Sequence, residues 1–149
     1  MFRVIIADDE NRIVKMLAAS IPWTKLGLSV ASFASDGMEA LRLAEEKKAD
    51  IIITDIRMPG LNGLELCEKL HEANPNIQII LISGYADFSY AQRAIQLGVL
   101  GYCLKPVDIQ YLQKLLRQAV QNIRREVSLQ ADTLLDLSLI HISEPTRLD

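Results

Sequence analysis

The sequence contains no apolar run that approaches membrane-spanning length, and no signal-peptide pattern precedes its first apolar segment. We therefore expect a soluble, cytoplasmic protein with no membrane contact. A GxxxxGK[ST] phosphate-binding loop is also missing, which argues against nucleotide hydrolysis.

Cysteine and basic charge are scarce as well. The 149 residues include two cysteines, Cys67 and Cys103, both in apolar surroundings, which predicts buried reduced thiols rather than a disulfide or a metal pair. The net charge is -3 and no basic patch stands out along the sequence, so we expect a poor nucleic-acid binder by itself. Half of the residues are hydrophobic, which is enough for the core of one domain of ordinary size.

What is present is a regular alternation of apolar and amphipathic segments. Apolar runs typical of buried parallel strands occur at residues 3–7, 28–33, 50–54, 77–82 and 101–104. An amphipathic stretch follows each run and predicts a helix there, with Asp36 and Asp108 as N-caps of two of them. The pattern predicts an α/β fold with five βα units around a doubly wound parallel sheet.

Charged residues follow three of these strands at the point where the strand ends. Asp8, Asp9 and Glu10 follow the first strand, Asp55 follows the third, and Lys105 follows the fifth. Because the carboxyl ends of parallel strands share one edge of the sheet, we expect three carboxylates, those of Asp8, Asp9 and Asp55, and the ammonium group to meet in one crevice. A cluster of carboxylates implies a bound cation or shifted pKa values, and oxygen ligands favour Mg2+.

Four motifs carry a resemblance to a known family. The patterns Asp-Asp-Glu, Thr-Asp-Ile-Arg-Met-Pro-Gly, Ile-Ser-Gly-Tyr and Leu-Lys-Pro occur in this order, and over about residues 1–125 the chain resembles the receiver domain of two-component response regulators. The resemblance implies a flavodoxin-like sheet with strand order 2-1-3-4-5. It also implies a histidine kinase as partner, Mg2+ as cofactor, and no enzymatic turnover beyond self-phosphorylation and autodephosphorylation.

The resemblance assigns a role to the residues at the strand ends. Asp55 would accept the phosphoryl group. Mg2+ would be held by Asp8, Asp9, Asp55 and the backbone carbonyl of Arg57, with Asp9 as a direct ligand and Asp8 bound partly through water. Lys105, whose bond to the following proline is cis in the family, would pair first with Asp55 and then with the phosphoryl group.

Ser83 and Tyr102 would connect this site to an outer surface. Ser83 would donate to a phosphoryl oxygen, and Tyr102 would fill the space that Ser83 leaves. Phosphorylation would then repack the surface of the fourth helix, fifth strand and fifth helix and favour a homodimer. Two plainer interpretations stay open, namely a turn serine and a core aromatic with its hydroxyl at the surface.

A narrower resemblance concerns the Trp-x-x-Leu-Gly stretch at 23–27 and the Gly-Tyr-x-x-Phe-x-Tyr-Ala stretch at 84–91. Both are similar to receivers joined to AraC-type DNA-binding domains, which implies the input half of a transcription regulator that contacts DNA only through a missing C-terminal domain. The alternatives are a stand-alone receiver that acts by protein contact and an aspartyl-phosphate phosphohydrolase. The latter would need a second aspartate two residues after Asp55, where this chain has Arg57.

The last part of the chain has its own pattern. After Ile109 no glycine or proline occurs for many residues, and apolar residues recur at spacings of three and four. We therefore expect residues 126–136 to form a linker helix that extends the fifth helix and either pairs with a partner or frays. Residues 137–149 look like a translated sequencing-library adapter, so we expect a non-native tail and a native sequence cut near Asp136.

Overall fold

The computed structural model describes residues 1–84 and 88–142, with side chains described up to residue 129. Its strands are β1 Phe2–Ala7, β2 Leu28–Ala34, β3 Ile51–Asp55, β4 Gln78–Ser83 and β5 Gly101–Leu104. Its helices are α1 Asn11–Ser20, α2 Gly37–Glu46, α3 Gly63–Ala73, α4 Phe88–Gln96 and α5 Ile109–Ile142, with a 3-10 turn, η1, at Thr24–Leu26.

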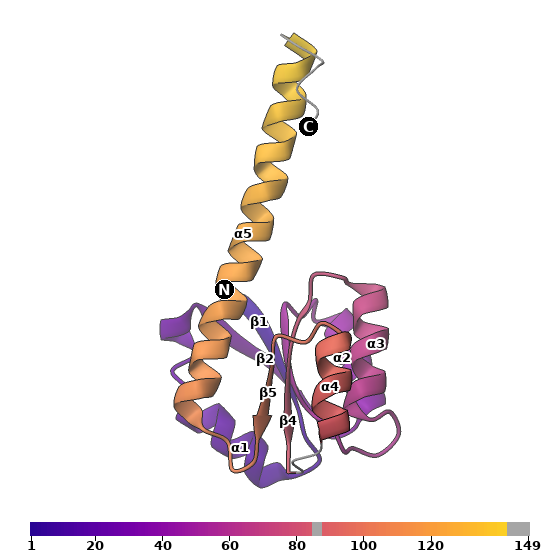
Figure 1. The fold of residues 1–149 in the computed structure, drawn as a ribbon. Helices are drawn as coiled ribbons and strands as arrows, with labels where there is room; N and C mark the ends of the chain where they lie inside the picture. Colours follow the sequence, from indigo (N-terminus) through magenta and orange to yellow (C-terminus); the bar gives the residue numbers. More distant parts are fainter. Residues whose placement is uncertain (85–87, 143–149) are drawn as a thin grey trace.

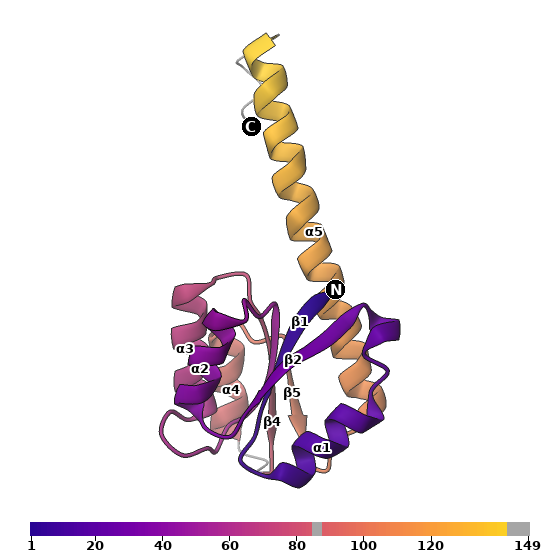
Figure 2. The same cartoon turned by 180° about the vertical axis from the view of Figure 1, so that it is seen from behind.

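The five strands form one parallel sheet in the order β2-β1-β3-β4-β5 (Figure 1). Helices α1 and α5 pack on one face of the sheet, and α2, α3 and α4 pack on the other, which is clear from both sides of the molecule (Figure 2). This arrangement confirms the predicted flavodoxin-like α/β fold. It also brings the carboxyl ends of β1, β3, β4 and β5 to one edge.

The central strands of the sheet are buried on both faces. The side chains of β1 from Val4 to Ala7, of β3 from Ile51 to Ile53 and of β4 from Ile79 to Ile82 are almost wholly buried. Alternate residues join two cores, one under α1 and α5 and one under α2, α3 and α4. β-Branched apolar side chains pack well in a sheet that is buried on both faces, and each strand ends where its run of such side chains ends.

Side-chain caps begin three of the helices. The carboxylate of Asp36 accepts a hydrogen bond from a backbone amide in the first turn of α2, and Asp108 accepts two from the first turn of α5, which confirms both predicted caps. The start of α3 carries a full capping box between Asn62 and Glu65 that the sequence interpretation does not include. These caps position the loops that surround the strand ends.

Both cysteines are free and buried, as predicted from their apolar surroundings. Burial raises the pKa of Cys67 to about 12 and that of Cys103 to about 11. Both thiols therefore stay protonated at neutral pH and are poor nucleophiles and poor metal ligands.

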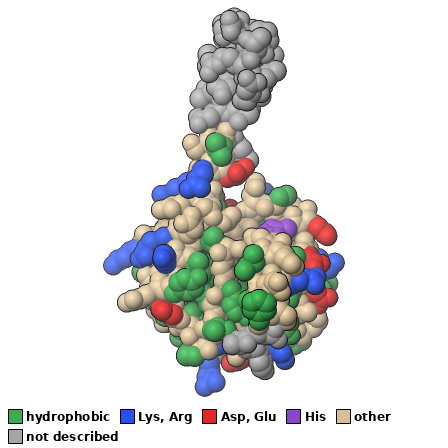
Figure 3. All heavy atoms as spheres, in the orientation of Figure 1, with side chains coloured by type: hydrophobic (Ala, Val, Ile, Leu, Met, Phe, Trp, Pro, Cys, Tyr) green, Lys and Arg blue, Asp and Glu red, His purple; other side chains and the backbone are tan. Residues whose placement is uncertain are grey.

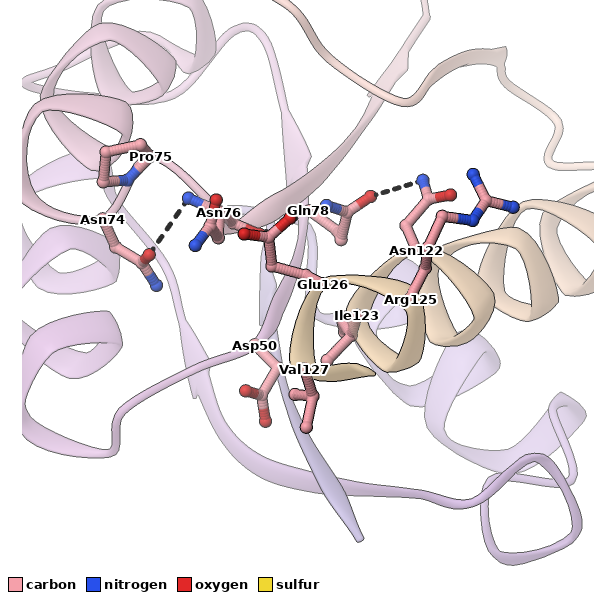
Figure 4. A pocket seen from close by; sticks show the side chains of 10 residues that line it. All are labelled: Asp50, Asn74, Pro75, Asn76, Gln78, Asn122, Ile123, Arg125, Glu126 and Val127. Carbon is pink, nitrogen blue, oxygen red and sulfur yellow. Dashed lines mark hydrogen bonds between the residues drawn. The ribbon is translucent and has the colours of Figure 1, made fainter. Parts of the chain in front are cut away.

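Helix α5 continues far beyond the sheet (Figure 1). Asn122 on α5 donates a 2.9 Å hydrogen bond to the side chain of Gln78 at the start of β4, beside a pocket of about 460 Å³ at the edge of the sheet opposite Asp55 (Figure 4). The helix includes the predicted linker at 126–136 and runs on through 137–142, the first part of the segment predicted to come from an adapter; that origin stays a prediction.

Within the described residues, no helix combines the length and apolar character needed to cross a membrane.

Candidate functional site

Lys105 is surrounded by carboxylates at the edge where the strands end. Its Nζ donates to Asp55 Oδ2 at 3.0 Å and lies 3.1 Å from Asp8 Oδ2 and 3.4 Å from Glu10 Oε1. The backbone amide of Lys105 donates to the carbonyl of Ser83 at 2.7 Å, and the peptide bond to the following proline is cis. The fold therefore brings the predicted carboxylates and the ammonium group into one crevice.

Asp8 is the most buried carboxylate of this crevice, with 1 % of its surface exposed. Its Oδ1 accepts a 2.9 Å hydrogen bond from the backbone amide of Glu10. Its Oδ2 is close enough to Lys105 for an ion pair, but no described residue donates a hydrogen bond to it with acceptable geometry. A buried carboxylate oxygen without a donor offers an open coordination position for a cation.

The electrostatics of the crevice show an excess of negative charge. Burial raises the pKa of Asp8 to about 6, with a smaller contribution from the charge of Asp55 and against the opposing effects of Glu10 and Lys105. Burial alone would lower the pKa of Lys105, but its contacts with Asp55 and Asp8 outweigh that effect and raise this pKa above its usual value. One ammonium group is therefore held protonated among several carboxylates and does not neutralise them all.

These carboxylates fit a hard divalent cation. One oxygen each from Asp8, Asp9, Glu10 and Asp55 lies within 4.8 Å of the others. Asp8 and Asp55 are buried, whereas Asp9 and Glu10 are exposed, so the cluster opens to water on one side. Mg2+ prefers oxygen ligands and keeps several of its waters, which matches a half-open site of this kind.

The pocket beside the cluster has a volume of about 370 Å³ and is lined by Asp9, Glu10, Asp55, Arg57, Gly84 and Lys105. Arg57, predicted to contribute its backbone carbonyl, extends its guanidinium group toward α4. There it donates to the hydroxyl of Tyr90 at 3.5 Å and lies 5.7 Å from the centre of that ring. This contact links the loop after β3 to α4.

The two predicted switch residues lie on neighbouring strands. Ser83 ends β4 and is fully buried, whereas Tyr102 in β5 is half-buried and packs against the core under α2, α3 and α4. Both make interactions in the folded domain. Their packing agrees with the plainer interpretations and with the switch interpretation alike, so the switch stays a prediction.

Two features of the site are absent from the sequence interpretation. Glu10 belongs to the Asp-Asp-Glu motif, but its distance of 3.4 Å from Lys105 depends on how α1 begins. Gly63, the first residue of α3, lies against the end of β3: its amide donates to the carbonyl of Ile56 at 2.7 Å. A Cβ at Gly63 would meet the carbonyl oxygen of Asp55 and lie 2.8 Å from the Cα of Ile56. The only sequence signal for this approach is a glycine at the start of a helix.

Comparisons with known proteins agree with this geometry. The sequence model of the response regulator receiver domain matches residues 4–117. An uncharacterized transcriptional regulatory protein of Bacillus subtilis, YesN, is 37% identical over 126 residues, which are 85% of this chain and 34% of the relative. The chain thus spans about one third of that relative's length.

Two solved structures are similar throughout the receiver region. One is the REC domain of AraT, a response regulator from Geobacillus stearothermophilus, with 40% identity, a TM-score of 0.79, and coverage of 84% of this chain and 97% of that one. The other is a two component transcriptional regulator AraC from Clostridium phytofermentans, with 31% identity, a TM-score of 0.77 and the same coverage. The acidic crevice, the fold and these matches agree, and they show that this chain belongs to the response regulator receiver domain family.

Proposed function

We propose that this chain is a phosphorylation-controlled signalling receiver, which accepts a phosphoryl group on Asp55 from a histidine kinase and forms the input half of a transcription regulator. The observation that carries the proposal is the buried carboxylate of Asp55, held 3.0 Å from Lys105 beside an acidic cluster and an open pocket. The relatives named as transcriptional regulators support the second half of the proposal.

The chemistry is a phosphoryl transfer. An oxygen of Asp55 forms a bond to phosphorus while the donor's own bond to phosphorus breaks, and the leaving group departs with that electron pair. Mg2+, held by Asp8, Asp9, Asp55 and the backbone carbonyl of Arg57, would neutralise the phosphoryl oxygens. Lys105 is already in contact with Asp55, and its compact ammonium group on a flexible stem can move its hydrogen bond to a new phosphoryl oxygen.

Acetyl phosphate with Mg2+ is expected to add one phosphoryl group to the chain, at Asp55. Intact-mass analysis should show this addition in wild type and in Asp36→Asn, which keeps its helix cap, but not in Asp55→Ala. Chelation of Mg2+ should lower the labelling rate at least about 100-fold, because charge repulsion would then be unopposed. Equal labelling of Asp55→Ala would refute the proposal, and hydrolysis so fast that no phosphorylated chain accumulates would favour a phosphohydrolase.

The same proposal includes a path from Asp55 to the surface of α4, β5 and α5. Ser83 and Tyr102 lie on adjacent paired strands, where Ser83 is opposite Leu104 and Tyr102 opposite Leu81. A phosphoryl group that accepts a hydrogen bond from Ser83 favours one packing of this pair, and one such charged hydrogen bond is worth about 1–3 kcal/mol. The favoured packing would promote a homodimer.

Ser83→Ala is therefore expected to accept phosphate but to dimerise about tenfold more weakly on activation than wild type. Sedimentation with and without beryllofluoride measures this difference. Ser29→Ala, an exposed change in β2 at the opposite edge of the sheet from β5, serves as the matched control and should dimerise like wild type. A Ser83→Ala variant that associates as strongly as wild type would contradict the proposed path.

A further inference from the structure

Exposed basic side chains gather on one layer of the molecule, formed by α1, η1 and α5. These side chains are Arg12, Lys15, Lys25, Lys114, Arg117, Arg124 and Arg125. Figure 3 shows Lys and Arg side chains along this edge, beside the base of the long helix. We call this surface the basic layer. Glu126 is the single acidic side chain in the described residues of these three elements.

The opposite layer has no excess of positive charge: Lys47 and Lys48 follow α2, but in the helices themselves acidic side chains outnumber basic ones. Helices α2, α3 and α4 carry six glutamates (Glu39, Glu45, Glu46, Glu65, Glu68 and Glu72) and three Arg or Lys side chains (Arg42, Lys69 and Arg93). Two of those cations are paired, Arg42 with Glu46 and Arg93 with Glu68. By contrast, none of the seven cations of the basic layer forms an ion pair with a described residue. A net charge of -3 for the whole chain hides this separation.

The α5 part of the basic layer is a continuous stripe. At 100° per residue, Lys114, Arg117, Arg124 and Arg125 fall within an arc of about 100° that extends for about 16 Å along the helix. This arc lies opposite the buried face of α5, which includes Leu116. Arg125 and Glu126 both line the pocket at the edge of the sheet, and in Figure 4 Glu126 points toward Asn76.

The chemistry of the stripe is polar throughout. Exposed glutamines, Gln110, Gln118 and Gln121, lie in or beside it, whereas the exposed large apolar side chains of α5, Tyr111, Val127 and Leu129, lie outside the arc. A protein partner is normally held by apolar or aromatic anchors, and an amphipathic helix at a membrane surface inserts apolar side chains. Arginine, lysine and glutamine without such anchors are instead the side chains that contact nucleic-acid phosphates.

We propose that the basic layer binds the phosphate backbone of duplex DNA. The contact is independent of sequence, because contacts to phosphates carry no sequence information, and it does not require phosphorylation at Asp55. It revises the expectation of a poor nucleic-acid binder, which rests on charge counted along the sequence. It also goes beyond the proposed function, since it assigns DNA contact to the receiver domain itself.

The test is fluorescence anisotropy of a labelled 30-base-pair duplex of arbitrary sequence, titrated with the 149-residue chain at several NaCl concentrations. We expect dissociation constants of about 1–100 μM, which are typical of non-specific binding. A plot of the logarithm of the association constant against the logarithm of the salt concentration should have a slope of about -3 to -4, which corresponds to four phosphate contacts. Arg117→Glu combined with Arg124→Glu should weaken binding at least about tenfold. Lys48→Glu combined with Lys69→Glu, with the same charge change on the opposite layer, should stay within about threefold of wild type.

Three results would overturn the proposal: no saturable binding at 25 mM NaCl, equal weakening by the two double variants, or tighter binding to phosphatidylserine vesicles or poly-glutamate than to DNA at equal salt. Phosphorylation of Asp55 by acetyl phosphate in both double variants verifies that they are folded. If the glutamate variant does not fold, Arg117→Gln combined with Arg124→Gln replaces it and should weaken binding about threefold or more. Because phosphorylation and DNA binding are measured separately, failure of one does not imply failure of the other.

Discussion

Replacing Asp8 by asparagine is expected to raise the free energy of unfolding by about 2–3 kcal/mol at pH 8 in the absence of divalent ions. Burial raises the pKa of Asp8 from 3.8 to about 6, and a change of that size corresponds to about 3 kcal/mol against the ionised form in the folded protein. Asparagine removes this charge and can still accept the hydrogen bond from the amide of Glu10.

The pH dependence of this gain has a definite sign. Below about pH 4 Asp8 is protonated in both the folded and the unfolded state, so no charge is buried on folding. The stability gained by Asp8→Asn then vanishes. Between about pH 4 and 6 the folded state holds the proton more tightly, so wild-type stability falls as the pH rises. Above pH 6 the carboxylate is ionised in both states and the gain is at its maximum.

Urea unfolding followed by the fluorescence of Trp23 measures this effect. Glu10→Gln is the matched control: Glu10 belongs to the same cluster but its side chain is 51% exposed, so we expect a change within about 0.5 kcal/mol. Added Mg2+ should stabilise wild type more than Asp8→Asn and narrow the gap. An equal gain at pH 4 and pH 8 would show that the charge of Asp8 is not its cause.

The strands and the composition of the site could be predicted from the sequence because both follow from local patterns. Apolar runs such as Val4–Ala7 and Ile51–Ile53 identify buried parallel strands, and parallel strands must end at one edge. Asp55 and Lys105 are the first charged residues at two such ends. Their proximity therefore follows from topology, without any knowledge of side-chain contacts.

The division of roles inside the site could not be predicted in the same way. Asp8 and Asp9 are adjacent and chemically identical, yet Asp8 is buried and Asp9 exposed, and nothing in the two residue types distinguishes them. The charge separation between the two helix layers is equally hidden. Lys15 and Lys114 lie far apart along the sequence and share a layer only because α1 and α5 pack on the same face of the sheet.

Gly63→Ala is expected to destabilise the domain by about 2–3 kcal/mol, although helix propensity alone predicts the opposite. Alanine in place of glycine stabilises a helix by about 1 kcal/mol. At Gly63, however, the new Cβ would overlap the carbonyl oxygen of Asp55 and lie 2.8 Å from the Cα of Ile56. Both neighbours are backbone atoms of a buried strand end, which cannot rotate away as a side chain would, so overpacking decides the sign.

The same overlap should reach the chemistry, because the atom that the Cβ meets belongs to Asp55, the proposed phosphoacceptor. If α3 or the end of β3 shifts, Asp55 moves relative to Lys105, and we expect labelling by acetyl phosphate to slow at least about tenfold. Gly84→Ala is the matched control for stability, because among the described residues its Cβ would meet only the flexible side chain of Lys105, at 3.9 Å. Urea unfolding of both variants measures the difference, and a Gly63→Ala protein as stable as Gly84→Ala would show that α3 can move without strain on the strand that carries Asp55.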